Sequence, residues 1–250
     1  MMERNRGGPA AHRPVTSLQF DRQRNIADQA YTFLRDQIVM VDLDPGAPIN
    51  ERALVEQLGV SRTPIREAVR RLSSEGLIDI IPNVGTFVSG LSMAKLEEGH
   101  LIRSSLECAT IRIAADRFDA AADARLQETL ARHRDAHAHG ASRDVIAADD
   151  EFHKIIVEIS GFPAVWTIIR QARAELDRLR HMTTHVPGRS PSAIREHTDI
   201  LDALRTGDPD RCQQTLQRHL DISFDVILSI FENRPDNPGR NRNTAVAQQR

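Results

Sequence analysis

The sequence predicts a mainly α-helical protein with two parts, an N-terminal winged helix-turn-helix and a C-terminal all-α antiparallel bundle of six or seven helices. Three observations lead to this fold. Near residue 60, a short helix, a glycine turn and a second helix with one apolar face follow each other. Two β-rich segments around a turn-forming quartet come next. From residue 91 to about residue 232, the apolar spacing is helical and no strand pattern appears.

Charge and cysteine content exclude several classes of protein. The 250 residues carry a formal net charge of −2, which argues against nonspecific coating of nucleic acid. The two cysteines, Cys108 and Cys212, are far apart, so no disulfide framework is implied and we expect a cytoplasmic protein. No apolar run approaches the ~20 residues that a membrane-spanning helix needs. The N-terminal residues lack the apolar segment of a signal peptide.

Composition and periodicity divide the chain into four segments. Residues 1–20 and 233–250 are polar and poor in large apolar side chains, which predicts disordered tails. Residues 21–90 form the predicted winged helix-turn-helix. Residues 91–232 form the predicted helical domain, in which residues 165–182 read as one helix.

The second helix of the turn motif has two distinct faces. Gly59 supplies the turn after a short helix over Glu51–Leu58, and Ser61 is a good N-cap. The apolar stripe that follows consists of Ile65, Ala68, Val69 and Leu72. Arg62, Thr63, Arg66 and Arg70 fall on the neighbouring arc. A helix that is apolar beneath and carries guanidinium groups on one open side fits the major groove of DNA.

A small hairpin, or wing, follows this helix. Residues 77–81 and 86–88 are β-rich, and residues 82–85 (Pro-Asn-Val-Gly) favour a turn between them. Wings usually lie beside the DNA backbone or minor groove. A hairpin that only closes the small core is the alternative, and the two roles are compatible.

Residues 31–88 resemble the winged helix-turn-helix of the GntR family of bacterial transcription regulators. The residues that carry the resemblance include Pro45-Gly46, Glu51, Leu54, the run from Leu58 to Ala68, Leu72, Glu75-Gly76-Leu77 and Gly85. The resemblance implies a double-stranded DNA operator as partner. The DNA-contacting residues that it implies are Arg35, Arg52, Ser61, Arg62, Thr63, Arg66, Asn83 and Gly85. For Arg70 and Arg71, a solvated surface role is at least as plausible as DNA contact.

Four residues of the helical domain have the chemistry of a metal site. Asp149 and His153 are four residues apart and face the same way on one helix, while His197 and His219 lie on two later helices. One carboxylate and three imidazoles that converge in a bundle suit Zn²⁺, Ni²⁺ or another divalent ion. By spacing alone, four partly exposed polar residues are the alternative. A second histidine group, His133, His137 and His139, stands at a polar helix end, where we expect solvent exposure.

Residues 92–231 are similar to the FCD effector-binding domain of FadR-type GntR regulators. The matching features are Arg103 with Leu106-Glu107, the run from Asp149 to His153, Glu196-His197 and Arg218-His219. The resemblance implies a divalent metal on Asp149, His153, His197 and His219, with Zn²⁺ first and Ni²⁺ or Mn²⁺ as alternatives. It also implies a small carboxylate effector. Arg103 is the candidate for binding this effector, and an ion pair with Glu107 is the competing role.

These features favour a ligand-responsive transcription regulator, a repressor by the family pattern, that binds a near-palindromic operator as a homodimer and is not an enzyme. A metal-dependent enzyme that uses the Asp/His cluster is the first alternative. A DNA-architectural protein without an effector is the second.

Overall fold

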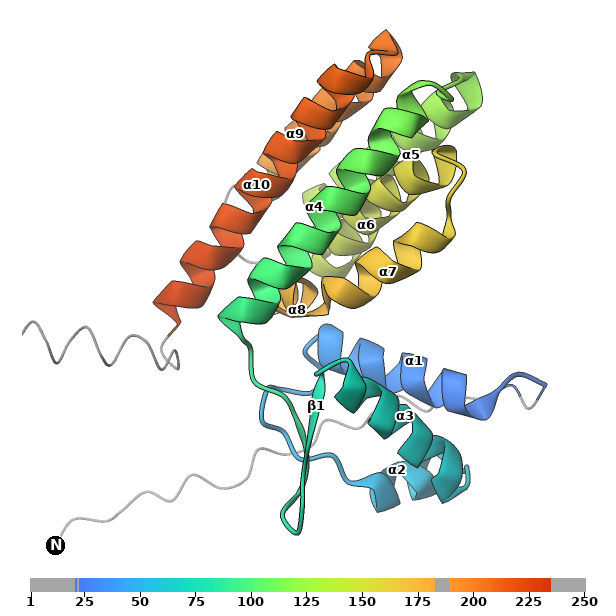
Figure 1. Cartoon of the computed structure of the whole chain (residues 1–250), viewed down its shortest axis with the longest axis vertical. Helices are drawn as coiled ribbons and strands as arrows, with labels where there is room; N and C mark the ends of the chain where they lie inside the picture. Colours follow the sequence, from blue (N-terminus) through green and yellow to red (C-terminus); the bar gives the residue numbers. More distant parts are fainter. Residues whose placement is uncertain (1–20, 22, 183–188, 235–250) are drawn as a thin grey trace, which may run out of the picture. The chain divides into compact units, whose positions relative to one another are not determined.

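The computed structural model describes residue 21, residues 23–182 and residues 189–234 (Figure 1). These residues form two compact units that divide between Ser89 and Gly90. The expected N-terminal tail, residues 1–20, lies outside the described residues, and so does most of the expected C-terminal tail. That tail was expected to begin at Asn233, which is instead the last residue of a helix.

The N-terminal unit has the predicted order of helices and hairpin. Its elements are α1 (Ile26–Val39), α2 (Glu51–Leu58), α3 (Arg62–Ser74), β1 (Ile78–Ile81) and β2 (Gly85–Val88). The two strands pair antiparallel, with Ile78 opposite Val88 and Ile81 opposite Gly85. A single bridge from Pro48 to Phe87 joins the segment before α2 to the hairpin. The winged helix-turn-helix fold is therefore confirmed.

Local signals set the start of α3. Gly59 adopts φ +63°, a left-handed conformation that glycine reaches at little cost, and it ends α2. Ser61 stands at the N-cap of α3, but its side chain makes no capping hydrogen bond, contrary to the usual role of serine there. The predicted stripe is buried, with exposures of 0–1% at Ile65, Ala68, Val69 and Leu72. This burial holds the opposite face of α3 outward.

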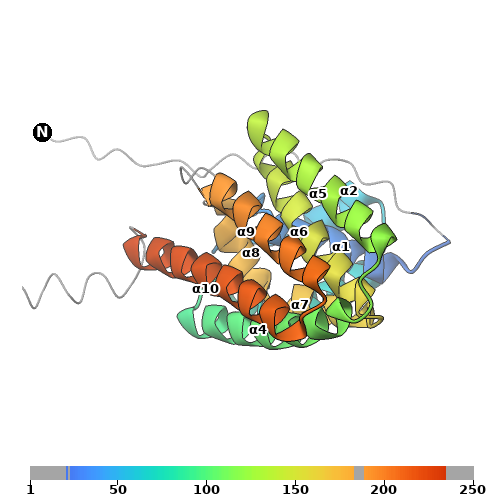
Figure 2. The same cartoon turned by 90° about the horizontal axis from the view of Figure 1, so that it is seen from above.

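The C-terminal unit is a bundle of helices (Figures 1 and 2). They are α4 (Met93–Ala115), α5 (Ala120–Ala138), α6 (Ser142–Ile159), α7 (Ala164–Ala172), α8 (Ala174–Met182), α9 (Arg189–Thr206) and α10 (Pro209–Asn233). The single helix expected over residues 165–182 is two helices, because the chain breaks at Arg173. Helices α4, α5, α6, α9 and α10 enclose one apolar core, which includes Ile111, Leu126, Phe152 and Leu216.

One close helix contact places α4 in the bundle. A Cβ atom added to Gly99 of α4 would lie 2.6 Å from the backbone oxygen of Ala172 in α7, so only glycine allows this approach. In the described part of the chain, no helix is long and apolar enough to cross a membrane.

Candidate functional site

The outward face of α3 and its neighbour α2 form a small basic surface. Arg62, Thr63 and Arg66 of α3 are exposed, and so is Arg52 of α2. A pocket of about 180 Å³ lies between the two helices, lined by Glu51, Arg52, Val55, Arg62 and Arg66. The arginines predicted at this surface are therefore together and accessible.

Two of these arginines form exposed ion pairs with neighbouring glutamates. Arg66 Nε lies 3.6 Å from Glu51 Oε2, and Arg52 Nε lies 3.0 Å from Glu56 Oε1. Exposed pairs of this kind contribute about 1 kcal/mol or less, so an external phosphate or base can replace them. Arg71 differs, because it pairs with Asp28 at 3.1 Å and its guanidinium lies 3.7 Å from the centre of the Tyr31 ring. Its role is to tie α3 to α1.

The remaining residues that were predicted to contact DNA differ in their exposure. Ser61, Asn83 and Gly85 are exposed, and Asn83 and Gly85 shape the wing with φ of +60° and +151°. Arg35 is a correction to the predicted set. Only 2% of it is exposed, so in this structure its side chain is not offered to an external ligand.

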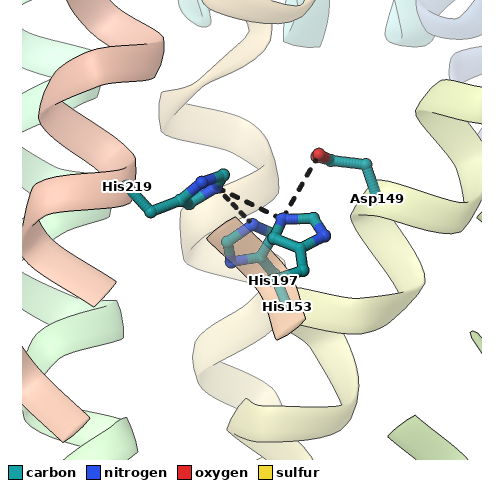
Figure 3. Close-up of side chains that lie close together, drawn as sticks. All are labelled: Asp149, His153, His197 and His219. Atoms are coloured by element: carbon teal, nitrogen blue, oxygen red, sulfur yellow. Dashed lines mark hydrogen bonds and ion pairs between the residues drawn. The ribbon is translucent and has the colours of Figure 1, made fainter. Parts of the chain in front are cut away.

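In the helical unit, the four predicted metal ligands meet at one point (Figure 3). Asp149 and His153 come from α6, His197 from α9 and His219 from α10. His219 Nε2 lies 3.2 Å from His153 Nε2 and 3.3 Å from His197 Nε2. His197 Nε2 lies 3.5 Å from Asp149 Oδ1. All four residues are buried.

This spacing fits a tetrahedral metal ion. Ligand atoms that surround zinc at about 2.0–2.1 Å with tetrahedral angles are about 3.3–3.4 Å apart. The three contacts in the cluster, at 3.2, 3.3 and 3.5 Å, bracket that separation. All four ligand atoms lie within 4.8 Å of one another, so the cluster is compact enough to surround one ion.

Two carboxylates lie behind the histidines of the cluster. His153 Nδ1 lies 2.7 Å from Glu107 Oε2, and His219 Nδ1 lies 2.7 Å from Glu196 Oε2. The contact of His219 is a hydrogen bond, and a carboxylate only accepts, so His219 carries a proton on Nδ1. The Nε2 atom of His219 therefore presents a lone pair to the cluster, 3.2 Å from His153 Nε2. Such a lone pair is a ligand for a cation at this position.

The charge state of the cluster also suits metal binding. Burial lowers the pKa of His219 to about 4 and that of His197 well below its ordinary value, so both rings are neutral at pH 7. Burial alone would raise the pKa of Asp149, but the Arg180 guanidinium and the three histidines together outweigh it and hold that pKa well below its usual range. Arg180 Nη2 lies 2.5 Å from Asp149 Oδ2, which leaves Oδ1 for the cluster.

Arg103 makes the predicted ion pair, and one of its donor groups has no partner among the described residues. Its Nε donates to Glu107 Oε1 at 2.8 Å. Its Nη2 is buried and has no hydrogen-bond partner within the described ranges. The ion pair is thus present, and it does not use the whole guanidinium.

The prediction for His133 was wrong. It is 1% exposed, and its ring centre lies 5.6 Å from that of His197. Its flanking arginines suggested a polar helix end, yet Leu126, Leu130 and His133 recur at i, i+4, i+7 on the buried face of α5. The contacts of Glu107, Glu196 and Arg180 with the cluster were also missed, since they depend on how separate helices pack.

Comparisons with known proteins fit both units. Residues 26–88 match the gntR family of bacterial regulatory proteins, and residues 99–222 match the FCD domain. The HTH-type transcriptional repressor RspR of Escherichia coli (strain K12) is 31% identical over 222 residues, 89% of this chain and 97% of that protein. The chain belongs to the GntR family. A probable D-xylose utilization operon transcriptional repressor of Paenarthrobacter nicotinovorans is 30% identical over 82% of this chain and 90% of its own length.

Solved structures of GntR regulators have the same fold. E. coli McbR/YncC superposes with a TM-score of 0.73 and 25% identity, over 82% of this chain and 98% of that one. A putative GntR regulator from Rhodococcus sp. RHA1 gives 0.67 at 24% identity, over 81% and 97%. This GntR protein is a transcriptional regulator that joins a gntR-type helix-turn-helix domain to an FCD domain.

Proposed function

We propose that this GntR regulator is a cytoplasmic repressor that binds its operator as a homodimer and responds to a small carboxylate bound at a metal ion. The metal is divalent, with Zn²⁺ preferred over Ni²⁺ and Mn²⁺, and its ligands are Asp149, His153, His197 and His219. The observation that carries the proposal is the convergence of one carboxylate oxygen and three imidazole nitrogens in a buried site. Metal binding supplies the positive charge that this arrangement lacks.

Operator recognition is assigned to the exposed face of α3. Arg62 and Arg66 lie one turn apart and present guanidinium forks, which suit guanine edges or phosphates. Ser61 and Thr63 at the start of α3, and Arg52 of α2, are proposed to contact phosphate. Asn83 and Gly85 bring the wing to the DNA. Arg35 is left out of the interface because it is buried.

Exposed apolar side chains of the helical unit support dimerisation. Leu101 of α4 is 65% exposed and Ile168 of α7 is 53% exposed, and these two helices pack together. Phe162, just before α7, is 51% exposed. We propose that a second copy covers this surface. A two-fold dimer then matches a near-palindromic operator with half-sites one helical turn apart.

The effector is proposed to be a small organic acid. The buried Nη2 of Arg103 is available to a carboxylate, and guanidinium pairs with carboxylate in a fork. If such a ligand weakens operator binding by some factor, the operator must weaken ligand binding by the same factor. This reciprocity separates a regulator from an architectural protein, whose DNA affinity ignores small acids.

A metal-dependent enzyme remains the alternative, since the same cluster can activate water. Such an enzyme needs a general base beside the metal. The two carboxylates that contact the histidines, Glu107 and Glu196, each already lie 2.7 Å from an Nδ1 atom. Turnover of an ester or carboxylate that disappears in His197→Ala would favour the enzyme.

The decisive experiment is the metal content of untagged full-length protein, purified without chelator. We expect about one divalent ion per chain, lost in His153→Ala and retained in His137→Ala, which changes an exposed histidine outside the cluster. Small carboxylates are then screened for release of operator DNA by fluorescence anisotropy. No metal after addition of Zn²⁺ or Ni²⁺ would overturn the metal assignment and leave the DNA-binding domain unaffected.

A further inference from the structure

His133 of α5 is a buried polar side chain that has no place in the proposed metal site. Only 1% of it is exposed, and neither ring nitrogen has a hydrogen-bond partner among the described residues. Buried polar atoms are almost always paired, because leaving one unpaired forfeits its hydrogen bonds to water. A ring with both nitrogens unpaired therefore calls for a partner that is not part of the chain.

The ring lies beside the metal cluster without belonging to it. Its centre is 5.6 Å from that of His197, and the two ring planes are inclined by 55°. The Phe152 ring stacks on the His197 ring, with ring centres 4.4 Å apart and ring planes inclined by 6°. One face of His197 is therefore covered by an apolar ring. The four ligand atoms of the cluster lie within 4.8 Å of one another, and His133 is not in that group. His133 is thus a neighbour of the metal position, not one of the four ligands.

The surroundings of His133 define the chemistry of the missing partner. The imidazole ring of His133 carries at least one N–H donor in either tautomer. The Nδ1 atom of the adjacent His197 is also buried and has no hydrogen-bond partner in the described part of the chain. His133 can donate to a carboxylate oxygen from whichever ring nitrogen carries the proton. A small anion with more than one acceptor oxygen is the partner that such a set suits.

We propose that His133 is an effector-binding residue, which donates a hydrogen bond to an oxygen of the small carboxylate held at the Asp149/His cluster. The inference rests on the proposed metal site, since that site brings the carboxylate to this position. It assigns one contact to α5, in addition to the contact of Arg103 from α4. The specificity of the pocket for carboxylates is then set by both helices.

The test uses full-length protein loaded with Co²⁺, whose visible absorption reports ligands that reach the metal. Acetate is titrated into the wild type, His133→Phe, His133→Gln and the control His137→Gln, one turn along α5 and exposed. We expect Co²⁺ affinity to stay within about threefold in all four, because a residue outside the ligand set leaves the metal bonds intact. For His133→Phe, the acetate dissociation constant should rise about tenfold or more, as expected for a lost hydrogen bond to a charged group.

The remaining outcomes separate the inference from the proposed function. The amide of His133→Gln can still donate, so its acetate affinity should lie between wild type and His133→Phe; this variant also carries the test if the Phe variant does not fold. Unchanged acetate affinity in both variants would mean that His133 binds only water, and would overturn the inference alone. Loss of Co²⁺ binding in step with acetate binding would make His133 part of the metal scaffold, and would overturn it too. Absence of Co²⁺ binding in the wild type would overturn both proposals.

Discussion

Replacing Glu107 with glutamine tests whether the cluster depends on the carboxylates behind its histidines. Glu107 is 2% exposed and makes two contacts, with His153 Nδ1 at 2.7 Å and Arg103 Nε at 2.8 Å. Burial alone would raise the pKa of this carboxyl, but Arg103 and His153 outweigh it and hold the pKa well below the usual range. The Glu107→Gln variant removes the charge and keeps the shape. It leaves His153 less basic and free to adopt either tautomer.

The size of the effect follows from these contacts. Loss of a carboxylate partner of a metal-bound histidine lowers metal affinity about 10–100-fold, or about 1.4–2.8 kcal/mol. Glu107 should fall near the upper end, because no water reaches it to replace the lost charge. Glu196→Gln should fall near the lower end: its distance to His219 Nδ1 is also 2.7 Å, but the side chain of Glu196 is 18% exposed. Glu97→Gln, on the exposed face of α4, should change nothing.

The assay is competition for Zn²⁺ against a chromophoric chelator at pH 7.5, with circular dichroism to verify folding. The expected order of affinity loss is Glu107→Gln, then Glu196→Gln, then Glu97→Gln. A Glu107→Gln protein within twofold of the wild type would refute the reasoning, because the tautomer of His153 would then not matter to the metal. Equal losses in all three variants would also refute it, since a general effect of charge would explain them.

Three further predictions address DNA binding, packing and pH. Arg66→Ala should weaken binding to an in vitro selected operator by about 1–3 kcal/mol if Arg66 reads a base; an equal loss on random DNA, measured by anisotropy, would limit it to phosphate contact. Gly99→Ala should lower the free energy of unfolding in urea by about 1–3 kcal/mol, because its Cβ would lie 2.6 Å from the Ala172 oxygen; a neutral change would show that α4 and α7 separate easily. Metal-free protein should lose stability as the pH falls from about 6.5 to about 4. The reason is that His219 takes up a proton near pH 6.5 in the unfolded chain but only near pH 4 in the folded protein. A urea midpoint that does not change across that window would contradict the buried neutral ring.

Local signals explain which parts of the fold the sequence could predict. The bounds of α1 and α2 agree with the structure because the apolar helical spacing of α1 stops at Val39 and Gly59 ends α2. The break between α7 and α8 has no such signal. It occurs at Arg173, whose fully buried guanidinium lies 2.5 Å from Asp150 of α6 and 3.2 Å from Asp177. An ion-pair network between helices is invisible to a pattern that reads one helix at a time.

The sequence likewise predicted some residues of the candidate site and missed those that depend on how separate helices pack. The i, i+4 spacing placed Asp149 and His153 together, His197 and His219 were candidates from their places on two later helices, and the family resemblance joined all four as one ligand set. His133 was misjudged because its sequence neighbours are polar, although its buried position follows from the apolar residues three and seven positions before it. Glu107 was predicted only as a partner of Arg103. Its second contact, with His153, depends on the separation of α4 and α6, which no sequence spacing encodes.

The residues that hold the four ligands in place indicate which molecule, the metal ion or the organic acid, acts as the signal. Glu107 orients His153, Glu196 orients His219, Arg180 holds Asp149, and Phe152 stacks on His197. The ligands are therefore ordered by folding, so a metal ion binds without a further cost of ordering side chains. On the proposed function, an ion held by these ligands would stay bound while the concentration of an organic acid changes, and it would stabilise the bundle throughout. Operator affinity should accordingly follow the concentration of the carboxylate and not that of the free metal, which would make the metal a fixed part of the receptor and the acid its variable input.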